Sequence, residues 1–203
     1  TSASYFSACS SGLINLSEAK LKIIEYHESG EYDKELSEII DEAINYFSNL
    51  NTGSNDAVVF DIDETALSNY EINKLYDFGY VHELWDKWIN EEKAPAIPQV
   101  KKLYNFLIEK GVNIIFITGR KDHQYQSTYN NLIKEGFTEF DTLIVRHQYE
   151  FDLQAVKYKS AKRTELKGKG YNIIGTVGDQ YSDLEGVLHG YQVKIPNYQY
   201  YIE

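Results

Sequence analysis

Cysteine and methionine are almost absent from this chain of 203 residues. It contains no methionine, and Cys9 is its single cysteine. One thiol cannot form a disulfide within the chain, and metal sites built from several cysteines are excluded. Because the chain starts at Thr1, we expect it to be a processed or trimmed product. The small, Ser-rich segment 1–12 would suit a position just after a removed signal peptide, so we expect export to the periplasm or the cell exterior.

Positive charge and long apolar runs are also scarce. Lys and Arg number 20 against 31 Asp and Glu, so the formal net charge is −11. This charge argues against a nucleic acid polymer or an anionic membrane as the partner. No stretch approaches the roughly 20 apolar residues that a membrane span needs. A protein this acidic needs local positive charge from a metal ion, Lys or Arg wherever it binds an anion.

Hydrophobic residues are plentiful enough for a real core, at 42% of the chain. In residues 13–50 they recur at helical spacing in two blocks separated by Gly30, which predicts two amphipathic helices packed on the main fold. Ser17 or Ser29 is expected to cap a helix start. Residues 51–56 are polar and are expected to link these helices to a strand, so we predict an N-terminal helical segment over 1–56.

From Gln99 onward, apolar strands alternate with helices, and several of these helices end at a glycine. This alternation predicts an α/β fold with a parallel sheet and helices on both faces, over a core domain of residues 57–203. The predicted helices cover residues 100–107, about 123–135, about 160–169 and about 182–188. The predicted strands cover residues 57–60, 112–117, 142–145, 172–177 and 192–195.

An aromatic-rich insertion lies between the first strand and the next helix, at about residues 66–98. Most of its rings are expected to form the core of a small helical subdomain. The others could form an apolar slot for a flat substrate group, because aromatic faces stack well on nucleobases. The candidates for this substrate pocket are Tyr70, Trp85, Trp88 and, from a later strand end, Arg120.

Carboxylates follow the strands where open α/β sheets bind ligands. Asp61 and Asp63 follow the strand 57–60, and Asp179 and Asp183 follow the strand 172–177. Taken alone, an Asp-x-Asp pair also fits an Asx turn or a helix cap. Four carboxylates in one crevice repel one another, and a divalent cation would resolve this. Magnesium suits such ligands, namely the carboxylates of Asp61 and Asp179, a backbone oxygen of Asp63, and Asp183 through a water or by orienting a lysine.

The residue types at these strand ends suit phosphoryl transfer to an aspartate. Asp61 would attack phosphorus, and Asp63 would protonate the leaving alkoxide and then activate water. Thr118 would donate a hydrogen bond to a phosphoryl oxygen. Lys159, which we expect just before the helix 160–169, would supply positive charge to the nucleophile and the phosphoryl group.

These motifs resemble subfamily IIIB of the haloacid dehalogenase (HAD) superfamily, the acid phosphatases. The similar stretches are residues 60–69, 85–98, 116–120, 158–163 and 178–184, within a region from Ala57 to the C-terminus. The resemblance implies a Rossmann-like parallel sheet with a small helical cap, export, and a magnesium-dependent hydrolase acting on small phosphomonoesters, with nucleoside monophosphates as candidates. The subfamily includes bacterial secreted or lipoprotein acid phosphatases and plant storage proteins. Its spacing to Asp179 favours Lys159 over Lys162 as the catalytic lysine.

Three alternatives remain at this stage. A phosphotransferase would use the same residues with an alcohol as acceptor. A storage or binding protein could use the same fold without catalysis, although Asp61 and Asp63 are both present. A phosphorelay receiver shares the sheet type and the acidic cluster, but the aromatic insertion and the Asp-x-Asp pair argue against it. For the hydrolase, we expect a pH optimum below neutral because Asp63 acts as an acid only while protonated.

Overall fold

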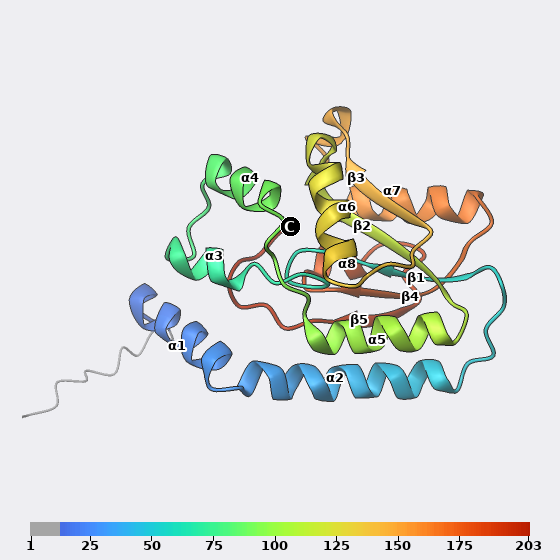
Figure 1. The fold of residues 1–203 in the computed structure, drawn as a ribbon, viewed down its shortest axis with the longest axis horizontal. Coiled ribbons are helices and arrows are strands. Elements are labelled where there is room, and N and C mark those ends of the chain that lie inside the picture. Colours follow the sequence, from blue (N-terminus) through green and yellow to red (C-terminus); the bar gives the residue numbers. More distant parts are fainter. Residues whose placement is uncertain (1–12) are drawn as a thin grey trace, which may run out of the picture.

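A five-stranded parallel sheet in the order β3-β2-β1-β4-β5 forms the centre of the protein (Figure 1). The computed structural model describes residues 13–203, so our expectations for segment 1–12, Cys9 included, lie outside the described residues. The strands are β1 (Asp56–Phe60), β2 (Asn113–Lys121), β3 (Thr142–Arg146), β4 (Asn172–Gly178) and β5 (Tyr191–Lys194). The helices are α1 (Leu16–Glu28), α2 (Glu31–Ser48), α3 (Tyr70–Leu75), α4 (His82–Asn90), α5 (Pro98–Glu109), α6 (Tyr125–Lys134), α7 (Ala155–Gly168) and α8 (Tyr181–Leu184), with single 3₁₀ turns η1 (Asp122–Gln124) and η2 (Gln148–Glu150).

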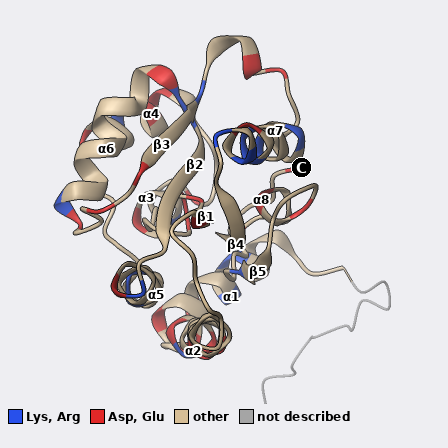
Figure 2. Cartoon of the chain, turned by 90° about the vertical axis from the view of Figure 1, so that its right-hand side faces the viewer, with Lys and Arg blue, Asp and Glu red and all other residues tan. Residues whose placement is uncertain are grey.

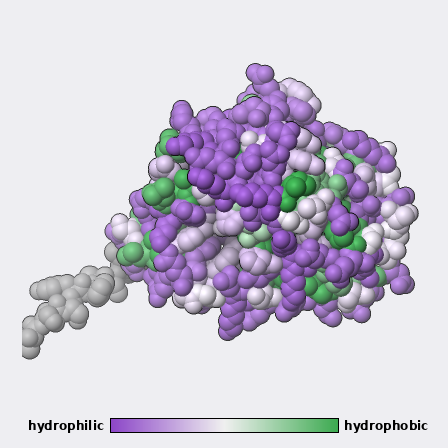
Figure 3. Space-filling model, viewed as in Figure 1, coloured by the Kyte–Doolittle hydropathy of each residue, from purple (hydrophilic) through white to green (hydrophobic). Residues whose placement is uncertain are grey.

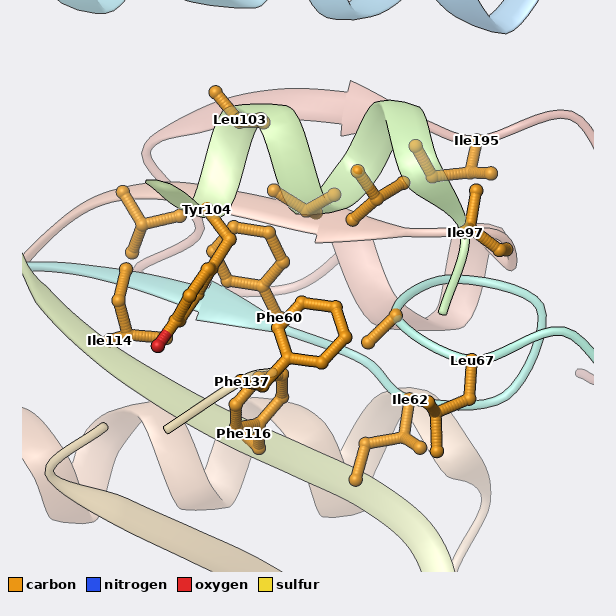
Figure 4. Close-up of a cluster of buried hydrophobic side chains, with 14 of the residues drawn as sticks. Phe60, Ile62, Leu67, Ile97, Leu103, Tyr104, Ile114, Phe116, Phe137 and Ile195 are labelled. Atoms are coloured by element: carbon orange, nitrogen blue, oxygen red, sulfur yellow. The ribbon is translucent and has the colours of Figure 1, made fainter. Parts of the chain in front are cut away.

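The central strand β1 is buried on both faces. Val58 and Phe60 point into the larger core, where Phe60 meets Phe116 of β2 (Figure 4). Ala57 and Val59 point to the opposite face. This alternation follows from the two-residue period of a strand, and a continuous apolar run is what a doubly covered strand requires. The predicted parallel α/β sheet with helices on both faces is therefore confirmed.

Helices cover the two faces unequally. α2, α5 and α6 contribute to the larger core on one face, whereas α7 covers the other (Figure 2). α2 comes so close to β4 that a Cβ at Gly175 would lie 2.5 Å from the Phe47 ring, so only glycine fits there. The N-terminal helix α2 therefore packs directly on the sheet. The proposed division of the chain at residue 56 stays a prediction.

Two helix boundaries differ from those predicted near the active edge of the sheet. α7 begins at Ala155, so Lys159 lies inside the helix and not before it. α8 ends at Leu184, well before residue 188, because the buried Arg163 donates hydrogen bonds to the carbonyls of Asp183, Glu185 and Val187. These bonds hold the segment after α8 as an irregular loop. Periodicity could not reveal this, because the arginine comes from another helix.

The start of α1 also differs from the prediction. Its cap is Asn15, whose Oδ1 accepts a 2.9 Å hydrogen bond from the N–H of Ser17. α2 begins after Gly30 in a left-handed conformation (φ 86°), and Ser29 only accepts a long 3.4 Å bond from Glu31 N. Glycine adopts a positive φ without a Cβ clash, so the chain turns here without a side-chain cap.

The expectation that most rings of the insertion are core residues is wrong. Of the six rings in 66–98, only Trp88 is buried, and it joins the main core. Tyr80 is 69% exposed, and Tyr76 is exposed as well. α3 and α4 have only 6 and 9 residues, so they are too small to enclose a core of their own. They stand to one side of the sheet as a small cap (Figure 1).

The surface is mainly hydrophilic, and hydrophobic residues form small separate patches on the face shown in Figure 3. No helix within residues 13–203 has the length and apolar character that a membrane crossing requires.

Candidate active site

Strand register brings the predicted site residues together. Phe60 in β1 lies opposite Phe116 in β2 and Val177 in β4. The N–H of Asp61 then donates a 2.9 Å hydrogen bond to Val177 O. Asp61 therefore sits between the ends of β2 and β4. The chain reaches β2 and β3 on one side of β1 and β4 and β5 on the other, and such a switch point is where open α/β sheets bind ligands.

Three buried carboxylates form the floor of the site. Asp61, Asp179 and Asp183 each offer an oxygen within 4.8 Å of the others. A Cβ at Gly178 would lie 2.5 Å from the Asp183 side chain, so this glycine permits the close approach. Burial raises the pKa of Asp61 well above its ordinary value, and Asp183 and Asp179 reinforce this against Lys159. Burial, together with Asp183 and Glu64, likewise raises the pKa of Asp179.

This donor set fits a hard divalent cation. Buried carboxylates with facing oxygens need a positive partner, and magnesium prefers a few carboxylates with its other positions left to water or phosphate. Asp179 is oriented from behind, because its Oδ2 accepts hydrogen bonds from Gln180 Nε2 (2.6 Å) and Asn197 Nδ2 (2.7 Å). The carboxylate of Asp63 is not in this group. Ligation by its backbone oxygen stays a prediction.

Lys159 is the cation of this floor. Its Nζ lies 2.5 Å from Asp61 Oδ1 and 2.9 Å from Asp183 Oδ1. It also donates a 2.5 Å hydrogen bond to Ile117 O. Burial alone would lower the pKa of Lys159, but Asp183 and Asp61 outweigh it and the net pKa is raised. The lysine is therefore held charged beside Asp61.

Lys162, the alternative lysine, points to a different set of carboxylates. Its Nζ lies 2.6 Å from Glu150 Oε1 and 3.2 Å from Glu165 Oε1. Positions 159 and 162 lie nearly one turn apart on α7, but their long side chains reach different partners, Asp61 and Asp183 for Lys159 and Glu150 and Glu165 for Lys162. Lys162 thus ties α7 to η2 and does not contact the carboxylate floor.

Arg120 binds Asp63 instead of standing free for a substrate. Its Nε and one terminal nitrogen contact Asp63 Oδ1 at 3.1 and 2.7 Å, while the other terminal nitrogen donates to Thr128 Oγ1. The Arg120 side chain is almost fully buried. Such a fork fixes both the position and the rotation of a carboxylate. Asp63 is therefore held at the wall of the site, beside Asp61.

A second chain of hydrogen bonds holds Asp63 from the cap side. Trp88 Nε1 donates to Asn69 Oδ1 (2.8 Å), and Asn69 Nδ2 donates to Asp63 Oδ1 (2.9 Å). The backbone N–H of Asn69 donates to Glu64, which also accepts a hydrogen bond from the hydroxyl of Tyr200. Burial raises the pKa of Glu64 to about 7. Sequence reasoning missed Glu64, Asn69 and Tyr200, although Glu64 and Asn69 lie inside the similar stretch 60–69, and it assigned Trp88 to the substrate pocket instead.

The site opens into a cavity of about 480 Å³ beneath the cap. Of the substrate-binding candidates, Trp85 and Arg120 line it. Trp88 does not, because it is buried in the main core. Tyr70 does not either: its ring stacks on His27 of α1 at 4.3 Å, and its hydroxyl donates to Glu28. Thr118 is fully buried behind the cavity, and its Oγ1 accepts a hydrogen bond from Arg120 N.

Several cavity residues have no counterpart in the sequence predictions. The C-terminal tail contributes Tyr200, Tyr201 and Ile202, and the ends of β2 and β3 contribute Lys121 and Arg146. The tail follows the last strand without a periodic pattern, so nothing in the sequence indicates that it returns to the site. Figure 1 shows the C-terminus lying between the cap and the sheet.

The structure thus combines a parallel α/β sheet with an aspartate directly after its central strand, a buried lysine and a triad of buried carboxylates. The family model of the HAD superfamily, subfamily IIIB (acid phosphatase), matches residues 13–203. The chain therefore belongs to this family of phosphatases, and the expected family, fold and enzyme class are confirmed.

Individual relatives agree with this membership. The chain is 38% identical over 167 residues to the "Stem 31 kDa glycoprotein" of Glycine max, covering 80% of this chain and 66% of that protein. It is 34% identical over 184 residues to "Acid phosphatase 1" of Solanum lycopersicum, covering 88% and 72%. Its fold matches the class C acid phosphatase from Bacillus anthracis with a TM-score of 0.73 at 23% identity, covering 92% of this chain and 85% of that one.

Proposed function

We propose that this protein is a magnesium-dependent acid phosphatase that hydrolyses small phosphomonoesters through an aspartyl-phosphate on Asp61. One observation carries the proposal. Asp61 is buried at a cavity floor, 2.5 Å from Lys159 Nζ and within 4.8 Å of two further carboxylates. An ordinary surface aspartate has no reason to occupy such a place, whereas a nucleophile that receives a phosphoryl group needs these charges.

The carboxylates of Asp61, Asp179 and Asp183 would hold the cation. When bound, it offsets their charge and that of the substrate phosphoryl oxygens. Asn197 and Gln180 keep Asp179 turned toward this position. The backbone oxygen of Asp63 is proposed as a further ligand.

The chain's own residues carry the chemical steps. A carboxylate oxygen of Asp61 forms a bond to phosphorus while the bond to the alcohol oxygen breaks, and Asp63 gives that oxygen its proton. Lys159 keeps positive charge beside Asp61 throughout. Thr118 is proposed to donate its hydroxyl proton to a phosphoryl oxygen, and because its side chain is fully buried, this contact requires the cavity wall to open. Asp63 then takes a proton from water as the water attacks phosphorus, which restores Asp61 and releases phosphate.

Arg120 and Asn69 position the acid for both half-reactions. Their hydrogen bonds meet on Asp63 Oδ1, at 2.7 and 2.9 Å, so the carboxylate cannot rotate freely. A general acid must lie within hydrogen-bond reach of the leaving oxygen. Because the carboxylate of Asp63 is already held in one orientation, it does not have to be ordered again when it acts. The pH optimum below neutral stays a prediction of this scheme.

The first experiment is Asp61→Asn, assayed with 4-nitrophenyl phosphate with and without magnesium. We expect turnover to fall at least roughly a thousandfold, because the amide cannot form the covalent intermediate. Asp152→Asn, an exposed carboxylate outside the cavity, is the matched control and should keep normal turnover. If the wild-type protein is inactive from acidic to neutral pH, or if Asp61→Asn keeps near-normal rates, the proposal is wrong.

A phosphotransferase would use the same residues and remains the alternative. The wide cavity could admit an alcohol in place of water after the first step. Product analysis with added glycerol or nucleoside distinguishes the two, since transfer yields a new phosphomonoester instead of free phosphate. For substrates, nucleoside monophosphates remain the candidates, supported by Trp85 at the cavity wall.

Export is the proposed location. It is supported by the name of the Glycine max relative, a stem glycoprotein, because glycoproteins are made in the secretory pathway. Fractionation of the cells that produce this protein tests this, and recovery of the protein with the cytosolic fraction would contradict it.

A further inference from the structure

Two cations without carboxylate partners face the catalytic cavity. Lys121 and Arg146 are directly paired in register at the ends of β2 and β3, and both line the cavity. Neighbouring residues in register on parallel strands point to the same face of the sheet. Within residues 13–203, neither cation forms an ion pair with Asp or Glu. The other two cavity cations, Arg120 and Lys159, are already committed to Asp63 and Asp61.

Arg146 is held in position by an aromatic ring, but its hydrogen-bond donors are not all used. Its guanidinium lies over the Tyr158 ring, 4.6 Å from the centroid, and its Nε is buried without a hydrogen-bond partner. The adjacent acid Glu150 is paired with Lys162 at 2.6 Å. Burial lowers the pKa of Arg146 from its ordinary value, while Tyr158 and Glu150 oppose this. A buried donor left unpaired costs free energy, so the Arg146 guanidinium has hydrogen-bonding capacity that no other described residue uses.

Lys121 is held in place by His82 and Phe151. Its Nζ lies 2.7 Å from Nε2 of His82 in the cap and 5.4 Å from the centre of the Phe151 ring. Asp86 is the acid on this side of the cavity, with its carboxylate bound to Gln124 Nε2 and 3.5 Å from His82. Because Asp86 lies nearer to the Lys121 side, Arg146 is the stronger anchor for an anion.

We propose that Arg146, assisted by Lys121, binds a second anionic group on the alcohol part of the substrate. The substrate class is then a phosphomonoester whose leaving alcohol carries another phosphate or a carboxylate. This inference rests on the proposed phosphatase function and deepens it. Two like charges placed side by side repel, and a shared anion turns this repulsion into binding. Arginine also presents the planar fork that matches phosphate and carboxylate.

The test compares substrates that differ only in the second anion. One pair is adenosine 3′,5′-bisphosphate against adenosine 5′-monophosphate, and the other is 2-phosphoglycerate against glycerol 2-phosphate. We expect kcat/KM of the wild-type enzyme to be roughly tenfold or more higher for at least one doubly anionic member, as for a charge-assisted hydrogen bond. The two pairs tell a phosphate from a carboxylate as the second group.

Variants then test whether Arg146 and Lys121, the proposed anion subsite, cause this preference. Arg146→Gln should remove most of the kcat/KM ratio between the doubly and the singly anionic member of a pair, and Lys121→Gln should reduce this ratio less. Arg146→Lys, which keeps the charge and loses the fork, should retain part of it. Lys157→Gln removes an exposed positive charge from α7 outside the cavity and should leave the ratio unchanged.

Three outcomes would overturn the subsite. The wild-type enzyme shows no preference within either pair; Arg146→Gln lowers kcat/KM equally for both members; or Arg146→Gln and Arg146→Lys both keep the full ratio. Failure of the phosphatase proposal looks different, because 4-nitrophenyl phosphate would then not turn over at all. In that case calorimetric binding of each pair to the Asp61→Asn protein tests the subsite alone, and equal affinities would reject it.

Discussion

Lys159 is the residue on which the charge balance of the site depends. It is almost fully buried, and its ammonium group touches two carboxylates and a backbone carbonyl. Removing one partner of a buried charge cluster leaves the others without compensation, which costs about 3–5 kcal/mol. The same contacts that keep Lys159 charged also place it beside Asp61. Its structural and chemical roles are therefore linked.

Replacing each lysine by methionine distinguishes Lys159 from Lys162, the two residues that the sequence offers as the catalytic lysine. We expect Lys159→Met to lose turnover of 4-nitrophenyl phosphate by at least roughly a hundredfold, since one charged contact of this kind contributes about 3 kcal/mol. Lys162→Met should keep turnover within a few-fold, while its thermal unfolding temperature falls because Glu150 loses its partner. Melting curves identify unfolded variants. Equal losses of turnover in two folded variants would refute the assignment.

The two tryptophans of the cap, Trp85 and Trp88, lie in different surroundings. Trp88 is buried and donates to Asn69, whereas Trp85 is half-buried and lines the cavity. Trp88→Ala should therefore destabilise the fold by about 3–5 kcal/mol. Trp85→Ala should change stability little and raise KM for nucleoside monophosphates more than for sugar phosphates, because base stacking is lost. Denaturant unfolding and steady-state kinetics check both, and an equal KM change for the two substrate classes would exclude stacking on Trp85.

Among the elements, α1 is a helix of 13 residues that buries none of them. Its end is held to the cap by His27, which stacks between Tyr32 (4.4 Å) and Tyr70 (4.3 Å), and by Glu28, which pairs with Lys74. His27 Nε2 is buried without a hydrogen-bond partner. The junction of α1 with the cap thus depends on a stacked imidazole.

Acidification should loosen this junction. Burial lowers the pKa of His27 below its ordinary value of 6.5, against the opposing effects of Asp33 and Glu28. The unfolded state then binds more protons between the two pKa values, so the stabilisation is present above pH 6.5 and is lost as the pH falls through the lowered value. Hydrogen exchange of α1 amides, corrected for intrinsic rates, should show less protection at pH 5 than at pH 7.5. His27→Phe should abolish this difference; an unchanged difference would contradict the role of His27.

Two helix boundaries show where the apolar periodicity of the sequence does not predict the structure. The periodic spacing near residue 182 predicts a helix that α8 does not complete, because Arg163 of α7 takes the carbonyls that follow it. Similarly, α7 starts earlier than its apolar pattern indicates and so carries Lys159 on its first turns. The early end of α8 comes from polar contacts between elements, which periodicity does not describe.

At the scale of the whole molecule, we expect the acidic site to make stability depend on a cation. The chain has a formal net charge of −11, and three of its carboxylates are buried together. A cation that binds only the folded state stabilises it by mass action, by about 2.7 kcal/mol at a hundred times its dissociation constant. Stability and the proposed catalysis therefore share one binding event.

Removal of metal ions should lower the thermal unfolding temperature, and magnesium should restore it in a concentration-dependent manner. Sodium chloride at equal ionic strength is the control for screening. Asp179→Asn should greatly reduce the magnesium-dependent shift, because it removes one of the three buried carboxylates. If magnesium produces no shift beyond that of sodium chloride, the proposed metal site is wrong.

The amino-acid sequence by itself determined the parallel α/β sheet and the placement of Asp61, Asp63 and Asp179 after strand ends, because strand and helix periods are local properties of the chain. Thr118, predicted to follow its strand, lies inside β2, which continues to Lys121. Only the tertiary structure decided which lysine meets Asp61, 98 positions away, and that Tyr200 returns to Glu64 across 136 positions. It also decided which aromatic rings face the cavity and that Arg146 stands beside Lys121. These features depend on side chains from distant segments meeting in space, and no local pattern records the direction in which a side chain points.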